Sequence, residues 1–350
     1  IELPYSPTNE KIISAQGELI STALFQILCQ ESGVQSSLLP ALEFMKTNED
    51  NCPDYTYIKE SLPKYLNGQD QHLFITQGYI CKDAFGHVSN LGRGGSDYTA
   101  TIIGAMVKAE EIQIWTDIDG IHNNDPRYVK QTELIREMSF DEAANLAFFG
   151  AKILHPACVT PAQEANVPVR VKNTFDPYTE GTLISHDCKR EVESAISSKD
   201  DEVLMNIVSN NTLSIHQFYA KVFDAFKTCQ IEIDMMSMAH QSFVVVVNSS
   251  CNLGKIVCML RDYATIHLEN DLAIVNIIGA CQKRSKKTIN RIITATKSIN
   301  VRMISQQRGE ENYIRFLVRS KDKIKTLQAV DLAINHNKRR GENQVRPGVA

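Results

Sequence analysis

An internal repeat in the second half of the chain constrains its fold more than any other feature. Residues 205–208 (MNIV) recur as 275–278 (VNII), and residues 231–237 recur as 299–305, each time followed by a polar turn and an apolar strand. Each copy reads strand, helix, strand, strand, helix, with a further strand expected at 265–268. This order predicts a ferredoxin-like split β-α-β unit that is used twice.

The chain ahead of the repeat is organised differently. From residue 10 to residue 121, helical and strand patterns alternate, which predicts an α/β/α sandwich with a mainly parallel sheet. The charged, serine-rich stretch 191–201 is interpreted as the linker that closes this first domain. We therefore expect a first domain at 1–190, ferredoxin-like units at 200–269 and 270–336, and a tail at 337–350.

Composition narrows the class of protein. Hydrophobic residues make up 43% of the chain and charged residues 22%, which is typical of a soluble globular protein. The net charge of -4 offers no general basic field for a nucleic acid, and no apolar run approaches the roughly 20 residues of a membrane helix. The nine cysteines include no C-x-x-C pair, so reduced thiols in the cytoplasm fit better than a zinc site or disulfides. We expect no nucleic-acid or membrane partner.

Local patterns place the elements of the first domain. Ser96 is the expected N-cap of one helix, because its hydroxyl can accept backbone N–H bonds. One strand ends in Thr116 and Asp117, and α/β folds place ligand-binding groups at the carboxyl ends of strands. The expected helices are 18–30, 55–66, 97–108 and 140–150, and the expected strands are 34–39, 73–76, 112–115 and 167–172.

A glycine-rich loop at residues 91–97 (LGRGGSD) opens the helix that follows it. Its three glycines allow backbone N–H groups to approach an anion, and the helix N-terminus adds partial positive charge. Taken alone, the loop is equally compatible with an ordinary turn. Because it carries Arg93, Ser96 and Asp97 and is followed one strand later by WTDIDG, the phosphate-binding interpretation is favoured.

Five segments, in this order along the chain, resemble the aspartate kinases of the amino acid kinase family. They are IISAQGELIST ending at Thr22, FITQGYI at 74–80, LGRGGSDYT at 91–99, WTDIDGIHNNDPR at 115–127 and FGAKILHP at 149–156. The resemblance runs over nearly the whole chain. It implies the amino acid kinase fold and transfer of phosphate from ATP to aspartate.

The resemblance implies three residues that would hold the amino acid and one that would act in catalysis. Glu18 would pair with the α-ammonium of aspartate, and Arg93 would hold its α-carboxylate as a bidentate fork. Ser96 would contact substrate or phosphate, and Asp97 would act in catalysis by orienting lysines. On their own, Glu18 and Asp97 are also compatible with carboxylates favoured by a helix dipole, and Arg93 with a surface salt bridge.

The resemblance also implies the nucleotide site. Lys152, a second catalytic candidate, and Arg127 would neutralise phosphate charge. Mg²⁺ would be held by the nucleotide and water, so we expect no protein ligand to the metal. An Asp-Pro-Arg turn is the simpler interpretation of residues 125–127. The implied ATP contacts are Gly94, Gly95, Thr116, Asp117, His122, Arg127, Lys152 and Ile153.

Two features depart from the family pattern. His122 stands where the family commonly has a tyrosine beside the nucleotide base, so we expect ATP binding with altered base contacts. The family's amino-terminal Lys-Phe-Gly-Gly-Thr-Ser segment does not occur in these 350 residues. Either a first strand lies outside this sequence or the protein has lost catalysis and kept sensing. We favour the first explanation, because the other charged residues of the site are present.

The repeated units resemble ACT domains, which in this family bind end-product amino acids between paired units. Asp234, expected at the end of a strand at 231–233, matches an effector-site position and would hold an effector ammonium group, with Met238 nearby. Met238 replaces a small hydroxyl or acidic residue of the family, so the match is partial. The resemblance implies lysine or threonine as effector and a homodimer or higher homo-oligomer.

We therefore predict an aspartate kinase that uses MgATP to make 4-phospho-L-aspartate, the first step of lysine, threonine and methionine biosynthesis, under feedback control through the ACT domains. Another amino acid kinase, such as a glutamate kinase, is the alternative within the enzymes. A non-catalytic amino-acid sensor is the alternative of another class, and it would bind lysine or threonine without binding MgATP.

Overall fold

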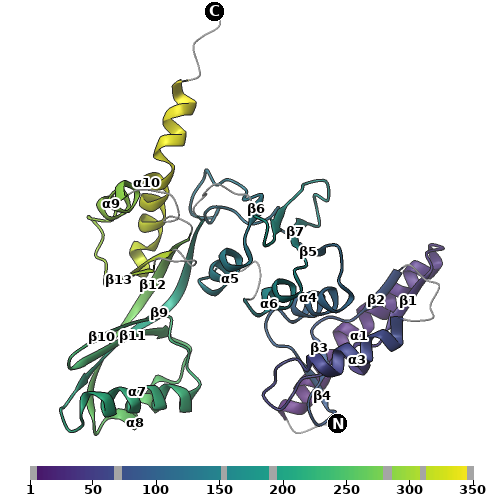
Figure 1. Cartoon of the computed structure of the whole chain (residues 1–350), viewed down its shortest axis with the longest axis horizontal. Helices are drawn as coiled ribbons and strands as arrows, with labels where there is room; N and C mark the ends of the chain where they lie inside the picture. The colour runs from purple at the N-terminus through teal and green to yellow at the C-terminus, as the bar shows by residue number, and fades with distance from the viewer. Residues whose placement is uncertain are drawn as a thin grey trace, which may run out of the picture. The chain divides into compact units, whose positions relative to one another are not determined.

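The computed structural model of the chain describes residues 6–66, 73–150, 156–188, 195–278, 286–307 and 313–344. The chain forms two compact units, which Figure 1 shows as a ribbon. The first unit comprises Ile1–Ile121, Arg136–Ala147 and Lys152–Lys189, and the second comprises His122–Ile135, Phe148–Ala151 and Arg190–Ala350. Two short segments of the predicted first domain, His122–Ile135 and Phe148–Ala151, thus belong to the same unit as the repeats. The predicted domain boundaries stay predictions.

The first unit alternates helices with short strands. Helix α1 (Pro7–Glu31) starts well before the predicted residue 18, because Ser6 caps it: the N–H of Asn9 donates to Ser6 Oγ at 3.1 Å, and Pro7 occupies the first turn. The other elements are β1 (Ser36–Leu39), α2 (Ala41–Phe44), α3 (Tyr55–Leu66), β2 (Leu73–Thr76), β3 (Ile80–Lys82), β4 (Val88–Asn90), α4 (Gly95–Val107), β5 (Ile112–Thr116), β6 (Glu137–Met138), α5 (Phe140–Phe148), α6 (Pro156–Ala165), β7 (Val169–Asn173) and β8 (Thr182–Ile184).

Most strand pairs of the first unit are parallel. Strands β1 and β2, β5 and β7, and β6 and β8 run parallel, whereas β7 and β8 and the hairpin β3–β4 are antiparallel. Four of these strands form a sheet in the order β5-β7-β8-β6. The predicted α/β class with a mainly parallel sheet is confirmed.

The helix that follows the glycine loop rests on a packed core. Ile102 of α4 is fully buried in one cluster with Phe44, Ile58 and Ile80. On its other side α4 lies so close to β5 that a Cβ on Gly104 would be 2.3 Å from a side-chain carbon of Ile112. This close packing fixes the last turn of α4 against the start of β5.

Helix α1 carries apolar side chains on its exposed side, including Ile13, Ile20 and Leu24, which are 70%, 57% and 61% exposed. By length and composition, residues Thr8–Glu31 could cross a membrane. One such helix is weak evidence, since mostly buried core helices and N-terminal signal sequences pass the same test, and only 11% of this stretch is buried. The expected absence of a membrane partner stays a prediction.

The second unit is built on one antiparallel sheet of six strands in the order β10-β11-β9-β12-β14-β13. Strands β9 (Ala195–Ser209) and β12 (Ala264–Ile278) are each 15 residues long and pair along both repeats, from Ser209 opposite Ala264 to Ala195 opposite Ile278. The other elements are α7 (Ile215–Cys229), β10 (Met235–Ala239), β11 (Ser242–Asn248), α8 (Leu253–Leu260), α9 (Lys286–Ala295), β13 (Met303–Gln307), β14 (Tyr313–Arg319) and α10 (Lys323–Gln344). The predicted repeat thus forms one continuous sheet.

Two predicted boundaries in this unit are wrong. Within the expected linker 191–201, residues from Ala195 onward already belong to β9, because Ile196 is buried and pairs with Ile277. The expected strand at 231–233 is absent from the described chain, and β10 starts at Met235, where pairing with β11 begins. Asp234 therefore immediately precedes an edge strand.

The segment 122–135 is anchored on the second repeat. Val129 is buried in the core formed by β9, β12, β14 and α10. Lys323 Nζ lies 4.5 Å from the ring centroid of Tyr128 and 2.9 Å from Asp200 Oδ2, and Gln328 donates to the Tyr128 carbonyl oxygen at 3.1 Å. The segment that carries the predicted ATP contacts His122 and Arg127 is therefore held by the second repeat.

Candidate functional site

The glycine loop turns the chain from β4 into α4. Gly92 and Gly94 have φ angles of 73° and 69°, in the left-handed region that residues with a Cβ rarely adopt. Gly94 is the N-cap of α4, and Ser96 lies within the helix, so the predicted capping role of Ser96 is wrong. The loop backbone starts the helix, and the Ser96 side chain remains exposed.

Two other glycines allow a second turn to press against α4. A Cβ on Gly78 would lie 2.9 Å from Ser96 Cα, and a Cβ on Gly95 would lie 2.8 Å from a ring carbon of Tyr79. The N–H of Tyr79 donates to Thr99 Oγ1 at 3.1 Å, and the Thr99 hydroxyl donates to the Gly95 carbonyl oxygen at 2.9 Å. The turn after β2 is thus fixed against the first turn of α4.

A chain of hydrogen bonds joins α1 to the same turn. Gln77, which is 2% exposed, donates from Nε2 to Thr22 Oγ1 at 2.8 Å and accepts at Oε1 from the N–H of Ala41 at 2.9 Å. The Thr22 hydroxyl donates to the Glu18 carbonyl oxygen at 2.7 Å. Because Gly78 follows Gln77 and touches α4, these bonds tie the turn of α1 that carries Glu18 to the start of the glycine-loop helix.

Gln77 and Gly78 are supports of the site that the sequence analysis did not single out. Both lie in the segment FITQGYI, which was used only as a mark of family resemblance. The signal that could have found them is a glycine directly after an amide side chain at the end of a buried strand, where a close backbone approach is expected.

The charged residues at the start of α4 differ in their solvation. Arg93 is exposed, whereas Asp97 is half-buried. Burial raises the pKa of Asp97 above its ordinary value. A poorly solvated carboxylate is stabilised in its charged form by a nearby cation, which fits the predicted role of orienting a lysine.

The end of β5 presents two further predicted ligand residues. The Thr116 hydroxyl donates to Asp117 Oδ1 at 3.1 Å, and Asp117 is exposed. Thr116 pairs with Asn173 of β7, so both stand at the carboxyl edge of a parallel pair. Open α/β sheets bind ligands at this edge.

The predicted nucleotide residues His122 and Arg127 lie in the segment held by the second unit. His122 Nδ1 is 2.9 Å from Thr132 Oγ1. Arg127 donates from Nη2 to Asp125 Oδ2 at 2.7 Å, within a turn closed by backbone bonds to the Asp125 carbonyl oxygen. Although burial alone would raise it, hydrogen bonds from Arg127 hold the pKa of Asp125 below its ordinary value. A phosphate would have to compete with Asp125 for Arg127.

Two predicted ATP contacts, Lys152 and Ile153, lie outside the described residues. The chain leading to them is tightly placed in the second unit. Gly150 has a φ of 96°, and a Cβ there would lie 2.0 Å from the Ser198 carbonyl oxygen. Phe149 is buried in a core with Met235 at the start of β10.

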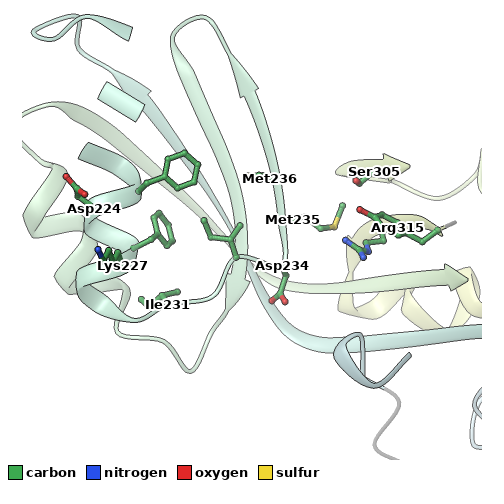
Figure 2. A pocket seen from close by; sticks show the side chains of 12 residues that line it. Asp224, Lys227, Ile231, Asp234, Met235, Met236, Ser305 and Arg315 are labelled. Atoms are coloured by element: carbon green, nitrogen blue, oxygen red, sulfur yellow. The ribbon is translucent and has the colours of Figure 1, made fainter. Parts of the chain in front are cut away.

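A cavity of about 720 Å³ opens at the junction of the two repeats (Figure 2). It is lined by polar and charged side chains of both repeats and by apolar residues such as Met236. The predicted effector residue Asp234 lines it, while Met238 is not among the lining residues and lies 49% exposed on β10. The polar and charged lining residues are Asp224, Lys227, Asp234, Ser305, Tyr313 and Arg315.

Comparison with known proteins gives consistent results at the level of sequence. The sequence pattern of the amino acid kinase family matches residues 7–173. Aspartokinase 1, chloroplastic, of Arabidopsis thaliana is 32% identical over 343 residues, which cover 92% of this chain and 60% of that protein. Lysine-sensitive aspartokinase 3 of Escherichia coli (strain K12) is 31% identical over 339 residues, which cover 93% of this chain and 75% of that protein. The chain thus spans only part of the length of these relatives.

Solved structures are similar over the same extent. E. coli aspartokinase III in complex with aspartate and ADP, in the R-state, matches with a TM-score of 0.83 at 30% identity, covering 95% of this chain and 77% of that one. The same enzyme in complex with lysine and aspartate, in the T-state, matches with a TM-score of 0.74, also at 30% identity and with the same coverage.

Proposed function

This chain belongs to the aspartokinase family, and from that membership we propose that it transfers the γ-phosphoryl group of ATP to the side-chain carboxylate of L-aspartate. A carboxylate oxygen attacks the γ-phosphorus, the bond from phosphorus to the bridging oxygen breaks, and ADP leaves. The product is 4-phospho-L-aspartate. Such a reaction asks the protein mainly for positioning and for charge stabilisation.

The amino acid is held at the start of α4. Glu18 binds the α-ammonium group, Arg93 binds the α-carboxylate, and Ser96 contacts the substrate or the transferring phosphate. The single observation that carries the proposal is the hydrogen-bonded link from the Glu18 turn through Thr22 and Gln77 to the turn that touches Ser96. It connects an acidic residue suited to an ammonium group with a loop suited to phosphate.

The nucleotide phosphates are held by backbone N–H groups at Gly94 and Gly95 and by the helix N-terminus they open. The φ angles of Gly92 and Gly94 fit this role, since they turn the loop backbone into the helix without a Cβ in the way. Mg²⁺ would be held through the nucleotide and water, with no protein ligand assigned, and would supply positive charge to the transferring group. Asp97 orients a lysine towards the charge on the transferring phosphoryl group. The remaining residues assigned to ATP binding are Thr116, Asp117, His122, Arg127, Lys152 and Ile153.

The regulatory part of the proposal concerns the second unit. We assign the cavity at Asp234 to an effector amino acid, lysine or threonine, as the lysine complex of the E. coli relative suggests. We further propose a cytoplasmic homodimer or higher homo-oligomer. Strands β10 and β13 are the sheet's edges, and Met236 of β10 is 54% exposed. Such an edge favours pairing with a second copy.

The test of catalysis is ADP release with MgATP and L-aspartate, compared with L-glutamate and uridine monophosphate as acceptors. Of these three acceptors, we expect turnover only with aspartate. In Glu18→Gln the KM for aspartate should be about 10- to 100-fold higher, because a charged hydrogen bond to the substrate is lost. Glu31→Gln changes the exposed last residue of α1 and is the matched control. ADP release that does not depend on aspartate would contradict the proposal. Binding of lysine or threonine with no heat from MgATP would favour the sensor instead.

A further inference from the structure

The carboxylate of Asp234 is already bound by an ammonium group of the chain itself. Lys199 Nζ lies 2.6 Å from Asp234 Oδ1 and 2.7 Å from Oδ2. The Asp234 side chain is only 2% exposed, whereas that of Lys199 is 26% exposed. Lys199 Nζ also lies 5.5 Å from the ring centroid of Phe148. A ligand ammonium that reaches Asp234 must therefore compete with Lys199.

A second carboxyl group stands beside this pair without a close partner. The Glu202 side chain is fully buried, and its Oε1 lies 3.7 Å from Lys199 Nζ. Neither of its oxygens accepts a hydrogen bond in the described part of the chain. Two acidic groups thus share one ammonium group, and Glu202 is placed to receive Lys199 after a small movement.

We propose that Lys199 is a built-in competitor for the effector site, and that an amino acid binds Asp234 through its ammonium group by moving Lys199 onto Glu202. This inference rests on the effector site of the proposed function and deepens it. Before binding, Lys199 neutralises Asp234. After binding, the ligand neutralises Asp234 and Lys199 neutralises Glu202. The exchange keeps each buried carboxylate paired, which matters because an unpaired buried charge is strongly unfavourable.

The class of ligand follows from the groups at the cavity. A primary ammonium fits at Asp234, because the ammonium of Lys199 already does. Arg315 of the other repeat lines the same cavity and can meet a carboxylate. Figure 2 shows Asp234 directly before β10 and Arg315 on β14, both at the border of the cavity. A zwitterionic amino acid therefore matches the cavity better than a simple amine.

The exchange releases a proton. Burial, and next the negative charge of Asp234, raise the pKa of Glu202 to about 8, so at neutral pH this carboxyl is mostly protonated. It must lose its proton to accept Lys199 as an ion pair. The charged and titratable groups that act on this cluster are Lys199, Asp234, Glu202, Cys251 and Glu232, together with the amide of Asn248. Ligand affinity is therefore expected to rise as pH increases from 6.5 to 8.5, flanking that pKa.

The experiment is calorimetric titration of the full chain with L-lysine and, separately, L-threonine, without ATP or aspartate. The double variant Lys199→Met with Glu202→Gln removes the competitor and keeps the charge balanced once the ligand binds. We expect it to bind at least one of the two amino acids about tenfold more tightly than the unchanged chain, or more. Lys255→Met removes an exposed lysine of α8 that does not line the cavity, and we expect its affinity to stay within about twofold.

A second variant keeps the inference testable if the double variant does not fold. Glu202→Gln alone removes the alternative partner of Lys199, so we expect weaker binding and no proton release, measured in buffers of different ionisation enthalpy. Equal affinities in the unchanged chain and the double variant, or no binding by either, would overturn the inference. So would proton release that persists in Glu202→Gln. None of these results bears on aspartate-dependent ADP release, so the kinase proposal is judged separately.

Discussion

The guanidinium carbon of Arg315 lies 3.6 Å from the ring centroid of Phe149, three residues ahead of the predicted ATP contact Lys152. The ring of Tyr313 lies 3.5 Å from the same guanidinium carbon, so the cation is in contact with two aromatic rings. Arg315 also lines the cavity that contains Asp234. Arg315 therefore joins that cavity to Phe149 by direct contact.

The first prediction concerns this contact. Phe149→Ala should lower the free energy of unfolding by about 3 to 5 kcal/mol, because Phe149 is 2% exposed and its removal leaves a void beside Met235. It should also raise the KM for ATP by displacing the chain before Lys152. Urea unfolding followed by circular dichroism measures the first effect, and ADP release measures the second. Phe175→Ala is the control, since Phe175 is 84% exposed, and an equal loss in both variants would contradict the prediction.

The second prediction concerns the contact between two turns. Gly78→Ala places a Cβ within 2.9 Å of Ser96 Cα, so the start of α4 must shift. A misplacement of about 1 Å at a substrate-positioning loop costs about 100-fold, here in kcat/KM for aspartate. Gly17→Ala is the matched control, because nothing lies within 4 Å of its added Cβ. As Gly17 is inside α1, alanine there should stabilise the fold by about 0.5 to 1 kcal/mol and leave activity unchanged.

The third prediction concerns Asp97. Asp97→Asn should lower kcat by about 100-fold or more with the thermal unfolding midpoint nearly unchanged, because the proposed role is to stabilise a catalytic cation. The exposed residue Asp187 provides the control variant Asp187→Asn. Since burial raises the pKa of Asp97, its ionised form is lost at a higher pH than for an ordinary aspartate. The acidic limb of the kcat/KM profile should therefore lie above the usual aspartate range, and a limb at or below that range would count against the role.

The fourth prediction concerns stability and pH. The pKa of Glu202 is about 8 in the folded chain and 4.5 as its ordinary value, so its protonated form favours folding. That stabilisation is present below pH 4.5 and is lost as the pH rises towards 8. Glu202→Gln should therefore be more stable than the unchanged chain at pH 8 by on the order of a few kcal/mol, with a much smaller difference at pH 5. The exposed residue Glu232 supplies the control Glu232→Gln, and a stability difference that does not change with pH would refute the assignment.

Several elements could be predicted from the sequence because local patterns specify them. The strand 73–76 and the helix 55–66 have the predicted bounds, and 205–208 and 275–278 lie in β9 and β12 as the repeat indicated. In each case the spacing of apolar residues along a short stretch, bounded by turn residues, is enough to specify whether the stretch forms a helix or a strand. The α/β order of the first unit followed from the same patterns.

Other features depended on partners that are distant in the sequence. The cap of α4 is Gly94 and not Ser96, because the loop approaches the helix in a left-handed conformation. Residues 195–201 of the expected linker form the start of β9, because a strand far along the chain pairs with them. The contact between Arg127 and Asp125 could have been predicted from the local Asp-Pro-Arg turn. That residues 122–135 belong to the same unit as the repeats could not be predicted from local sequence.

The sequence by itself determined the α/β class, the repeated architecture of the second half, and the segments that mark the family. Only the tertiary structure decided that Gln77 ties α1 to the turn beside the glycine loop, and that Lys199 forms an ion pair with Asp234 next to a buried Glu202. The physical reason is that a residue type reveals its charge and its capacity for hydrogen bonds. Which group it meets, and how much water surrounds the pair, depend on strands and helices brought together from distant parts of the chain.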